Sequence, residues 1–180
     1  QEFFGAFQEL FRLYMESGSK DKAKTALASA KKDIVGHPQA DRFGQFIEQL
    51  GGELNKPSVG DIMDIKFTDL KGKEVDLAQM KGKVVLVDFW ATWCGPCIAE
   101  LPNVLKAYED YNDKGFEIIG ISLDNAKDEE KLKDFIKDRN MSWAHAFDGK
   151  GWGNSLAKKF GITSIPATFL IGKDGKVASS

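Results

Sequence analysis

The stretch VVLVDFWATWCGPC, residues 84–97, joins an apolar run typical of a buried strand to the only two cysteines of the chain. Cys94 and Cys97 stand where that run passes into a segment compatible with a helix. A thiolate near a helix N-terminus is stabilised by unpaired backbone N–H groups and by the helix macrodipole, and it is therefore reactive near neutral pH. The second cysteine, three positions further on, can close a short disulfide. This spacing indicates thiol-disulfide redox chemistry.

Three other uses of a Cys-x-x-Cys pair compete with the redox interpretation. A structural zinc site needs four ligands, but the further candidates of the usual kind, His37 and His145, have unhelpful spacing. Covalent haem attachment requires a histidine directly after the second cysteine, where the chain has Ile98. A purely structural disulfide is the third alternative, although so short a loop removes little entropy from the unfolded chain. We therefore expect no bound metal and no organic cofactor.

Length and charge narrow the class of protein further. The 180 residues, 42% of them hydrophobic, suffice for one large domain or for one domain with a smaller appendage. The net charge of −2 gives no electrostatic support for nucleic-acid binding. No apolar run approaches the length of a membrane span. Because the sequence begins with Gln1 rather than Met, we expect a leader or membrane anchor outside it.

Residues 1–55 predict three short amphipathic helices that form an extension to the main domain. Turns are expected at 17–19, with Ser19 as a cap, and at 36–38, and Gly51-Gly52 is expected to end the third helix. Amphipathic helices usually bury their apolar stripes in a core, here either within the extension or against the main domain. The alternative is that the stripes form a docking or dimerisation module. The apolar residues at three- and four-residue steps are Phe3, Phe7, Leu10, Phe11 and Tyr14, then Ala23, Leu27, Ala30 and Ile34, then Phe43, Phe46, Ile47 and Leu50.

Residues 56–180 predict an α/β domain that follows a linker around residues 55–60. The alternation of strands and helices, with a closing hairpin turn at 173–176, predicts a mixed sheet with helices on both faces. Helices are expected at 98–111, interrupted near the start by Pro102, at 127–139 and at 153–160. Strands are expected at 64–68 and 74–77, paired as a hairpin, and at 84–90, 116–123, 143–147 and 168–171.

Two segments carry a family resemblance, residues 86–97 and the sequence SIPAT at 164–168. They resemble the two signature segments of the thioredoxin fold. Glu100-Leu101-Pro102 after the second cysteine is similar to the TlpA/ResA-like thiol-disulfide oxidoreductases, a bacterial family that is usually exported and often membrane-tethered. The resemblance covers Val59 to the end and implies a periplasmic or cell-envelope location. It also implies a further helix after Ser180, which this sequence does not contain.

The resemblance implies catalytic roles for four residues. Cys94 would be the exposed nucleophile, and Cys97, turned under by the first helical turn, would be the more buried resolving thiol. Asp88 occupies the place of the carboxylate that moves a proton to or from the resolving thiol in thioredoxins, where many TlpA-like proteins have a neutral residue. Glu100 resembles the acid that tunes cysteine pKa values in the ResA-like branch. The alternative for Glu100 is a solvated helix carboxylate.

The resemblance also implies a substrate-binding surface around the cysteines. Ile165-Pro166 stands where the family has a cis peptide, which would leave the backbone of Ile165 free to pair with an extended substrate. Trp93 and Trp90 would shield the disulfide and offer an apolar contact surface, with simple packing as the alternative. Gly95 and Pro96, between the cysteines, complete the expected substrate contacts.

The Gly95-Pro96 pair resembles that of reducing thioredoxins rather than the Pro-His pair of the oxidant DsbA. We therefore expect a reductant of protein disulfides that is recharged by an upstream electron donor. Two alternatives belong to other classes. A thiol peroxidase would need the pattern Pro-x-x-x-Thr-x-x-Cys of peroxiredoxins, which residues 88–92 do not supply. A binding module would use the thioredoxin scaffold without turnover.

Overall fold

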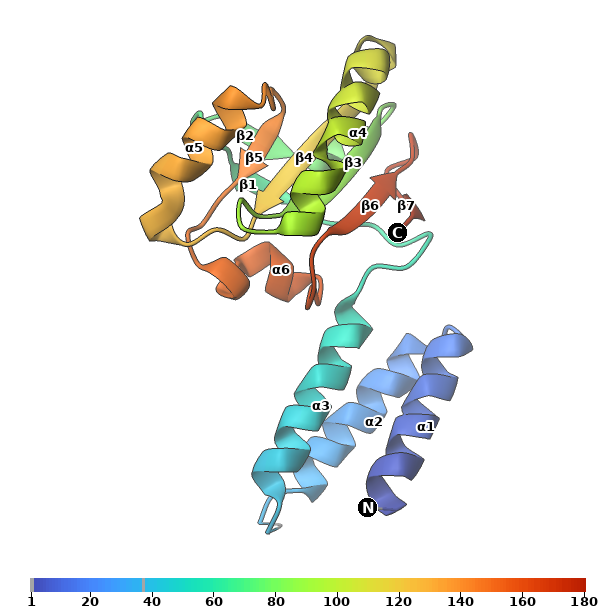
Figure 1. The fold of residues 1–180 in the computed structure, drawn as a ribbon. Helices are drawn as coiled ribbons and strands as arrows, with labels where there is room; N and C mark the ends of the chain where they lie inside the picture. The colour runs from blue at the N-terminus through green and yellow to red at the C-terminus, as the bar shows by residue number, and fades with distance from the viewer. Residues whose placement is uncertain (1, 37) are drawn as a thin grey trace. The chain divides into compact units, whose positions relative to one another are not determined.

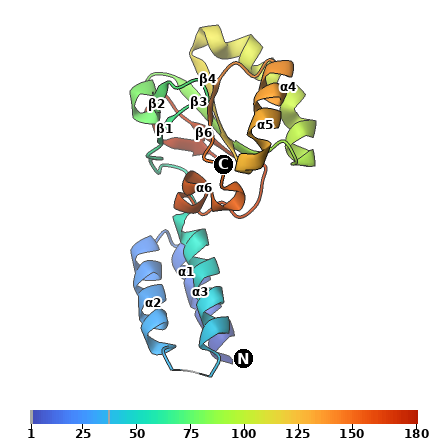
Figure 2. The ribbon, with the colours of Figure 1, turned by 90° about the vertical axis from the view of Figure 1, so that its left-hand side faces the viewer.

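The computed structural model describes residues 2–36 and 38–180, with side chains for 5–36 and 38–180. The chain divides into two compact units, Gln1–Lys56 and Pro57–Ser180 (Figures 1 and 2). His37, named above in a turn and as a zinc-ligand candidate, lies outside the described residues, as does the side chain of Phe3 in the first apolar stripe.

The first unit consists of the three predicted helices, α1 (Glu2–Glu16), α2 (Lys20–Asp33) and α3 (Ala40–Asn55) (Figure 1). Their apolar stripes pack against one another, which confirms that these stripes form a core of their own. Burial of such side chains is the main source of stability for helices of this length, since isolated helices are marginal in water. The buried residues of this core are Phe11, Ala23, Leu27, Ala30, Ile47, Leu50 and Leu54.

Two details of the helical unit differ from the sequence prediction. The prediction that Gly51-Gly52 ends the third helix is wrong, because α3 continues to Asn55. Leu54 is buried one turn after Leu50, and this burial offsets the poor helix propensity of two glycines, about 1 kcal/mol each. Ser19 stands at the N-cap position of α2, but its side chain makes no capping hydrogen bond.

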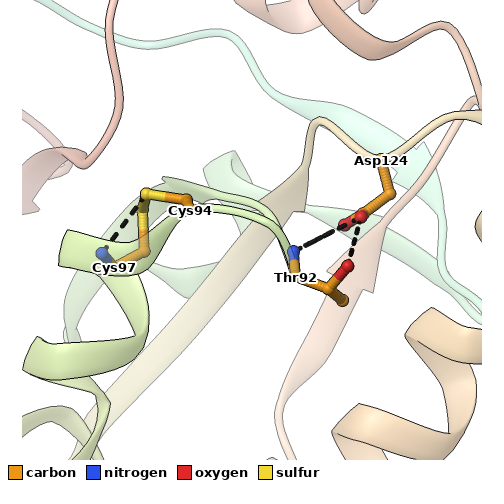
Figure 3. Close-up of a disulfide and its surroundings, with 4 residues drawn as sticks. All are labelled: Thr92, Cys94, Cys97 and Asp124. Carbon is orange, nitrogen blue, oxygen red and sulfur yellow. Dashed lines mark hydrogen bonds between the residues drawn. A yellow bond between two sulfur atoms is a disulfide. The ribbon is translucent and has the colours of Figure 1, made fainter.

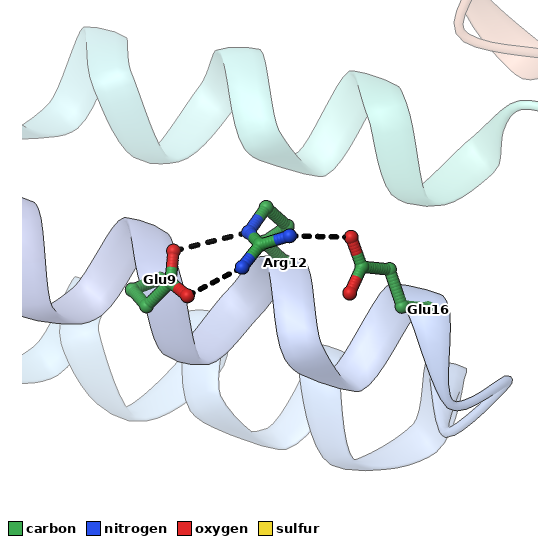
Figure 4. Close-up of polar contacts among 3 residues, drawn as sticks. All are labelled: Glu9, Arg12 and Glu16. Carbon is green, nitrogen blue, oxygen red and sulfur yellow. Dashed lines mark hydrogen bonds and ion pairs between the residues drawn. The ribbon is translucent and has the colours of Figure 1, made fainter.

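An ion-pair cluster lies on the exposed face of α1 (Figure 4). The Arg12 guanidinium donates to Glu9 at 2.5 Å and to Glu16 at 2.6 Å, at the spacings where side chains on one helix face meet. The hydrogen bond from Arg12 lowers the pKa of Glu9, and the same bond raises the pKa of Arg12. Because all three side chains are exposed, water screens these pairs and they contribute little to stability.

The second unit is built on a five-stranded mixed sheet, in the order β5-β4-β3-β6-β7 (Figure 1). Strands β3, β4 and β5 are parallel, and β6 and β7 are antiparallel to their neighbours. The hairpin β1–β2 forms a separate two-stranded sheet. The strands are β1 (Lys66–Thr68), β2 (Glu74–Asp76), β3 (Val84–Trp90), β4 (Phe116–Ser122), β5 (Ala144–Ala146), β6 (Ala167–Ile171) and β7 (Val177–Ser179). The helices are η1 (Leu77–Met80), α4 (Gly95–Tyr111), η2 (Asn112–Lys114), η3 (Ala126–Asp128), α5 (Glu129–Asp138), η4 (Gly151–Gly153) and α6 (Ser155–Lys159).

Successive side chains of β3 point to opposite faces of the sheet, as expected for a strand. They contribute to two apolar layers, one on each face. Val85, Val87 and Phe89 pack on the face covered by α6 and the β1–β2 hairpin. Leu86 and Trp90 pack on the face covered by α4 and α5. The predicted mixed sheet with helices on both faces is therefore confirmed, and Asp88 is placed on the α4 side by the same alternation.

Helix α4 starts earlier than predicted and is continuous. It begins at Gly95 instead of Ile98, so that Cys94 is its N-cap residue and Cys97 lies in its first turn. The predicted interruption at Pro102 is wrong, since the helix runs through this residue to Tyr111. Proline removes one intrahelical hydrogen bond, and burial of Leu101 on the sheet offsets that loss.

Gly120 of β4 lies under a closely packed aromatic group. A Cβ atom at this position would stand 2.6 Å from His145 Nδ1 and 3.1 Å from Trp90 Nε1. The His145 ring lies 5.7 Å from the rings of Trp90 and of Trp143. Burial lowers the pKa of His145 to about 4, so the ring is neutral at physiological pH.

The Gly120→Ala variant is expected to lower the free energy of unfolding of the second unit by roughly 1–3 kcal/mol, because the added methyl group overpacks the aromatic group. Urea unfolding followed by tryptophan fluorescence would measure this, since all four tryptophans lie in the second unit. Gly44→Ala in α3, where nothing lies within 4 Å of the new Cβ, is the control and should leave this transition unchanged. An unchanged midpoint for Gly120→Ala would contradict the close packing.

Candidate active site

Cys94 and Cys97 form a disulfide at the N-terminus of α4, with their Cα atoms 5.3 Å apart (Figure 3). The short segment Ala91–Trp93 leads from the end of β3 to the first cysteine. Cys94 is the N-cap, and its Sγ accepts a hydrogen bond of 3.2 Å from the backbone N–H of Cys97. In the reduced form the same N–H can stabilise a thiolate at Cys94, together with the positive end of the α4 dipole.

The relative burial of the two cysteines is the reverse of the prediction. Cys94 is only 5% exposed, whereas Cys97 is partly exposed, so the expectation of an exposed Cys94 and a more buried Cys97 is wrong for the disulfide form. Cys94 packs into the apolar layer that contains Phe89 and Ala91. Cys97 lies at the border of the two layers and contacts both.

A cavity of about 30 Å³ lies beside Cys97. Asp88, Glu100 and Pro166 also line it, together with Thr168, which is opposite Asp88 in the β3–β6 ladder. This volume suffices for roughly one water molecule, and the lining offers polar partners to it. The site therefore brings together three of the four predicted catalytic residues and one predicted substrate-binding residue.

Burial raises the pKa of Asp88 to about 6, since desolvation disfavours the charged carboxylate. No hydrogen bond or ion pair from the described residues reaches this carboxyl group. Near neutral pH it therefore exchanges a proton easily, which is the property that a general acid or base requires. Two other titratable side chains share this cavity with Asp88. They are Glu100 and the partly buried Cys97, which has a thiol once the disulfide is reduced.

The remaining predicted residues also surround the disulfide. Glu100 is exposed one turn beyond Cys97, and its carboxylate accepts a hydrogen bond from the Asn103 side chain. The peptide bond between Ile165 and Pro166 is cis, as the resemblance implied. Ile165 packs against the same apolar layer as the two cysteines. The predicted substrate contacts Trp93, Gly95 and Pro96 are exposed.

Sequence reasoning missed a buried polar cluster next to the first cysteine (Figure 3). The Asp124 carboxylate is fully buried and accepts hydrogen bonds from Thr92 N at 3.0 Å, Thr92 Oγ1 at 2.6 Å and Ser122 Oγ at 2.8 Å. The pairing of the two parallel strands could have revealed this cluster, because Trp90 and Ser122 are partners in the β3–β4 ladder. Residues two positions beyond each partner lie at the same edge of the sheet.

Among the residues that the structure describes, no group of three or more His, Cys, Asp or Glu side chains could hold a metal ion. Within the same residues, none of the helices combines the length and apolar character needed to span a membrane.

A two-cysteine disulfide that caps a helix directly after the central strand of such a sheet defines a thioredoxin-fold thiol-disulfide oxidoreductase. Comparisons with known proteins agree with this class. The ResA thiol-disulfide oxidoreductase of Bacillus cereus (strain ATCC 10987 / NRS 248) is 40% identical over 134 residues, which cover 74% of this chain and 72% of that protein. ResA of Bacillus thuringiensis subsp. konkukian (strain 97-27) is 36% identical with the same coverage.

Solved structures show the same fold. The thioredoxin domain of a thiol-disulfide oxidoreductase from Bacteroides vulgatus superposes with a TM-score of 0.59 at 34% identity, over 68% of this chain and 86% of that one. The thiol:disulfide interchange protein DsbE described from Chlorobium tepidum gives a TM-score of 0.60 at 31% identity, over 69% and 84%. The model of the AhpC/TSA family matches residues 59–180. The chain belongs to this family and resembles its ResA-like members.

The buried carboxyl group makes stability depend on pH. The folded pKa of Asp88, about 6, exceeds its ordinary value of 3.8, so the native state binds more protons than the unfolded chain between about pH 4 and 6. Stability is therefore expected to fall as the pH rises through this range, by roughly 2–3 kcal/mol in total. Asp88→Asn should remove this decrease.

The measurement is urea unfolding of the oxidised protein at pH 4 and pH 7. The advantage of Asp88→Asn over the wild type in the free energy of unfolding should be larger at pH 7 than at pH 4. A constant difference between Asp88→Asn and wild type would contradict the pKa of Asp88.

Proposed function

We propose that the protein is a reductant of protein disulfides that works through the Cys94–Cys97 pair. The observation that carries the proposal is the disulfide at the N-terminus of α4 with an acid of raised pKa in the adjoining cavity. The names of the ResA and DsbE relatives support the same type of chemistry.

The reaction begins with the reduced protein. The Cys94 thiolate attacks one sulfur of the substrate disulfide, which forms a mixed disulfide and releases the other substrate sulfur as a thiolate. Cys97 then gives up its proton and attacks Cys94 Sγ. The mixed disulfide breaks, and the second substrate thiolate leaves and takes up a proton. Two electrons have passed to the substrate, and the protein is left in the disulfide form described above.

The helix terminus supports Cys94 as the attacking residue. Its Sγ is within hydrogen-bond distance of the Cys97 N–H, and a thiolate there gains from the α4 dipole. The residues exposed beside Cys94 form the surface over which we propose that a substrate approaches it. Trp93, Gly95 and Pro96 are the proposed contacts on one side of the sulfur.

Asp88 is proposed as the group that accepts the proton of Cys97 in the resolving step. Both line the same cavity, whose volume fits one bridging water. Glu100 lines this cavity from the solvent side, and its negative charge would disfavour a thiolate at Cys97, which keeps the resolving thiol protonated until the mixed disulfide has formed.

The backbone next to Pro166 is proposed as the second contact for the substrate. Pro166 lines the cavity beside Cys97, and Ile165 packs on the same apolar layer as both cysteines. An extended peptide that pairs with the backbone of Ile165 would run past the sulfurs, as in other complexes that add a strand to an existing sheet edge.

Oxidised protein must be reduced again by an upstream electron donor. We propose that this cycle takes place in the periplasm or cell envelope and that the protein is tethered to a membrane by a segment outside this sequence, as the resemblance to the TlpA/ResA-like family implies. The role of residues 1–55 in docking or dimerisation stays a prediction. Exposed Leu10 and Leu13 on α1 are the surface residues that favour it.

Reduction of insulin by dithiothreitol tests the catalytic role of the pair. Cys94→Ser should abolish the acceleration of turnover, because no nucleophile remains to form the mixed disulfide. Cys97→Ser should form the mixed disulfide and then stall, which non-reducing gels would show as a trapped covalent complex. If Cys94→Ser kept wild-type turnover, the proposal would fail. If the wild-type protein itself showed no turnover, a binding module without redox chemistry would be favoured.

The direction of electron transfer is tested by equilibration with glutathione buffers. The Gly95-Pro96 pair predicts a potential nearer to the value of thioredoxin, about −270 mV, than to that of DsbA, about −120 mV. Mass spectrometry after alkylation would give the reduced fraction at each buffer ratio. A potential close to that of DsbA would make the protein an oxidant and overturn the proposed direction.

A further inference from the structure

We propose that Trp152 and Trp93 together form an aromatic platform beside the disulfide, and that this platform selects substrates with a large apolar side chain next to the target cysteine. The inference rests on the proposed function and adds to it a residue outside the signature segments. Trp152 belongs to η4, more than fifty positions after the cysteines.

The two indole rings lie against each other on the surface. Their centroids are 6.1 Å apart with an interplanar angle of 54°, and each residue is 47% exposed. Trp93 directly precedes Cys94, so the platform adjoins the attacking sulfur. Exposed tryptophans supply much of the binding energy at protein interfaces, because a rigid ring offers a large apolar area at a small entropic cost.

A single buried residue fixes both members of the platform. On one side, the Asp124 carboxylate accepts hydrogen bonds from the N–H and hydroxyl of Thr92, the neighbour of Trp93 (Figure 3). On the other side, the Asp124 carbonyl oxygen accepts a hydrogen bond of 3.2 Å from the N–H of Gly151, the neighbour of Trp152. The backbone next to each tryptophan is therefore tied to the same buried residue.

The backbone around Trp152 is fastened at further points. Gly151 has φ +55°, and a Cβ atom there would stand 2.7 Å from Asn125 Oδ1, so only glycine fits this approach. Lys150 pairs with Asn125 in an isolated β-bridge. On the other flank, the Asn154 side chain caps α6 by accepting hydrogen bonds from Leu156 N and Ala157 N at 3.0 Å each.

The position of Trp93 next to Cys94 places the platform beside the attacking sulfur. A substrate sulfur that reaches Cys94 brings the residues that flank the target cysteine onto this surface, where both rings are exposed. A leucine or phenylalanine side chain would bury apolar area against both indoles, whereas a charged or small polar side chain would gain little. An extended peptide with an apolar residue beside its cysteine is therefore the substrate class that fits.

The test compares two oxidised peptides that differ only in the residue beside one cysteine, leucine or serine, with separate pairs for the preceding and the following position. For at least one position, wild-type protein should reduce the leucine peptide with a kcat/KM about 5- to 10-fold higher, mainly through KM. Trp152→Ala should reduce this preference to less than about 2-fold, and Trp152→Phe should retain most of it. The redox potential of both variants should equal that of wild type, because Trp152 lies in η4, outside the Cys94–Cys97 segment and the helix that begins there.

Tyr111→Ala is the matched control. Tyr111 is 55% exposed at the C-terminal end of α4, roughly 25 Å along the helix from the cysteines, and its removal should leave the preference intact. Equal rates for leucine and serine peptides with wild type, or an unchanged preference in Trp152→Ala, would overturn the platform while the proposed function stands. Failure of wild type to reduce either peptide or insulin would instead refute the proposed function itself.

Discussion

The hydrogen bonds from Thr92 to the buried carboxylate of Asp124 hold the chain between the central strand and the first cysteine. Without them, the segment that leads from β3 to α4 would keep its packing and the backbone hydrogen bonds from Leu123 N–H to Trp90 O and from Cys94 N–H to Ala91 O, but it would lose its side-chain anchor to the end of β4. Burial of a polar group such as the Asp124 carboxyl is costly, but hydrogen bonds from a backbone N–H and two hydroxyl groups offset this cost. The chemistry of Cys94 depends on this arrangement, because the helix terminus provides the field that favours its thiolate.

The proposed proton transfer needs, in addition, an acid whose charged form is not stabilised by its surroundings. Asp88 lies on the strand face toward α4, where burial raises its pKa, and no hydrogen bond or ion pair from the described residues reaches its carboxyl group. Asp124 and Asp88 therefore differ in how the fold uses a buried carboxyl group. Hydrogen bonds hold Asp124 in place, whereas Asp88 receives none from the described residues and is the residue that we propose as the proton acceptor.

Much of this architecture could be predicted from the sequence. The apolar run 84–90 became β3 with the predicted bounds. The position of Asp88 beside Cys97 followed from the family resemblance. The position of Pro166 beside Cys97 followed from the family resemblance, not from periodicity. Helix ends were less predictable: α3 passes through Gly51-Gly52 because tertiary burial of Leu54 outweighs local propensity, which no local pattern reports.

Parts of the site could not be read from sequence because they depend on contacts between distant segments. The burial of Cys94 results from how the layer around Phe89 closes over it. Trp152 lies in a Gly-rich turn with no motif, and only the fold brings it to Trp93.

This separation of parts has an evolutionary consequence. The two cysteines are encoded in one continuous stretch, whereas the η4 ring that we propose for selectivity is encoded far downstream. With the proposed selectivity, substitution of the single ring in η4 would change which substrates are preferred while the two cysteines stay the same. Paralogues could then differ in their substrates and share the same disulfide chemistry.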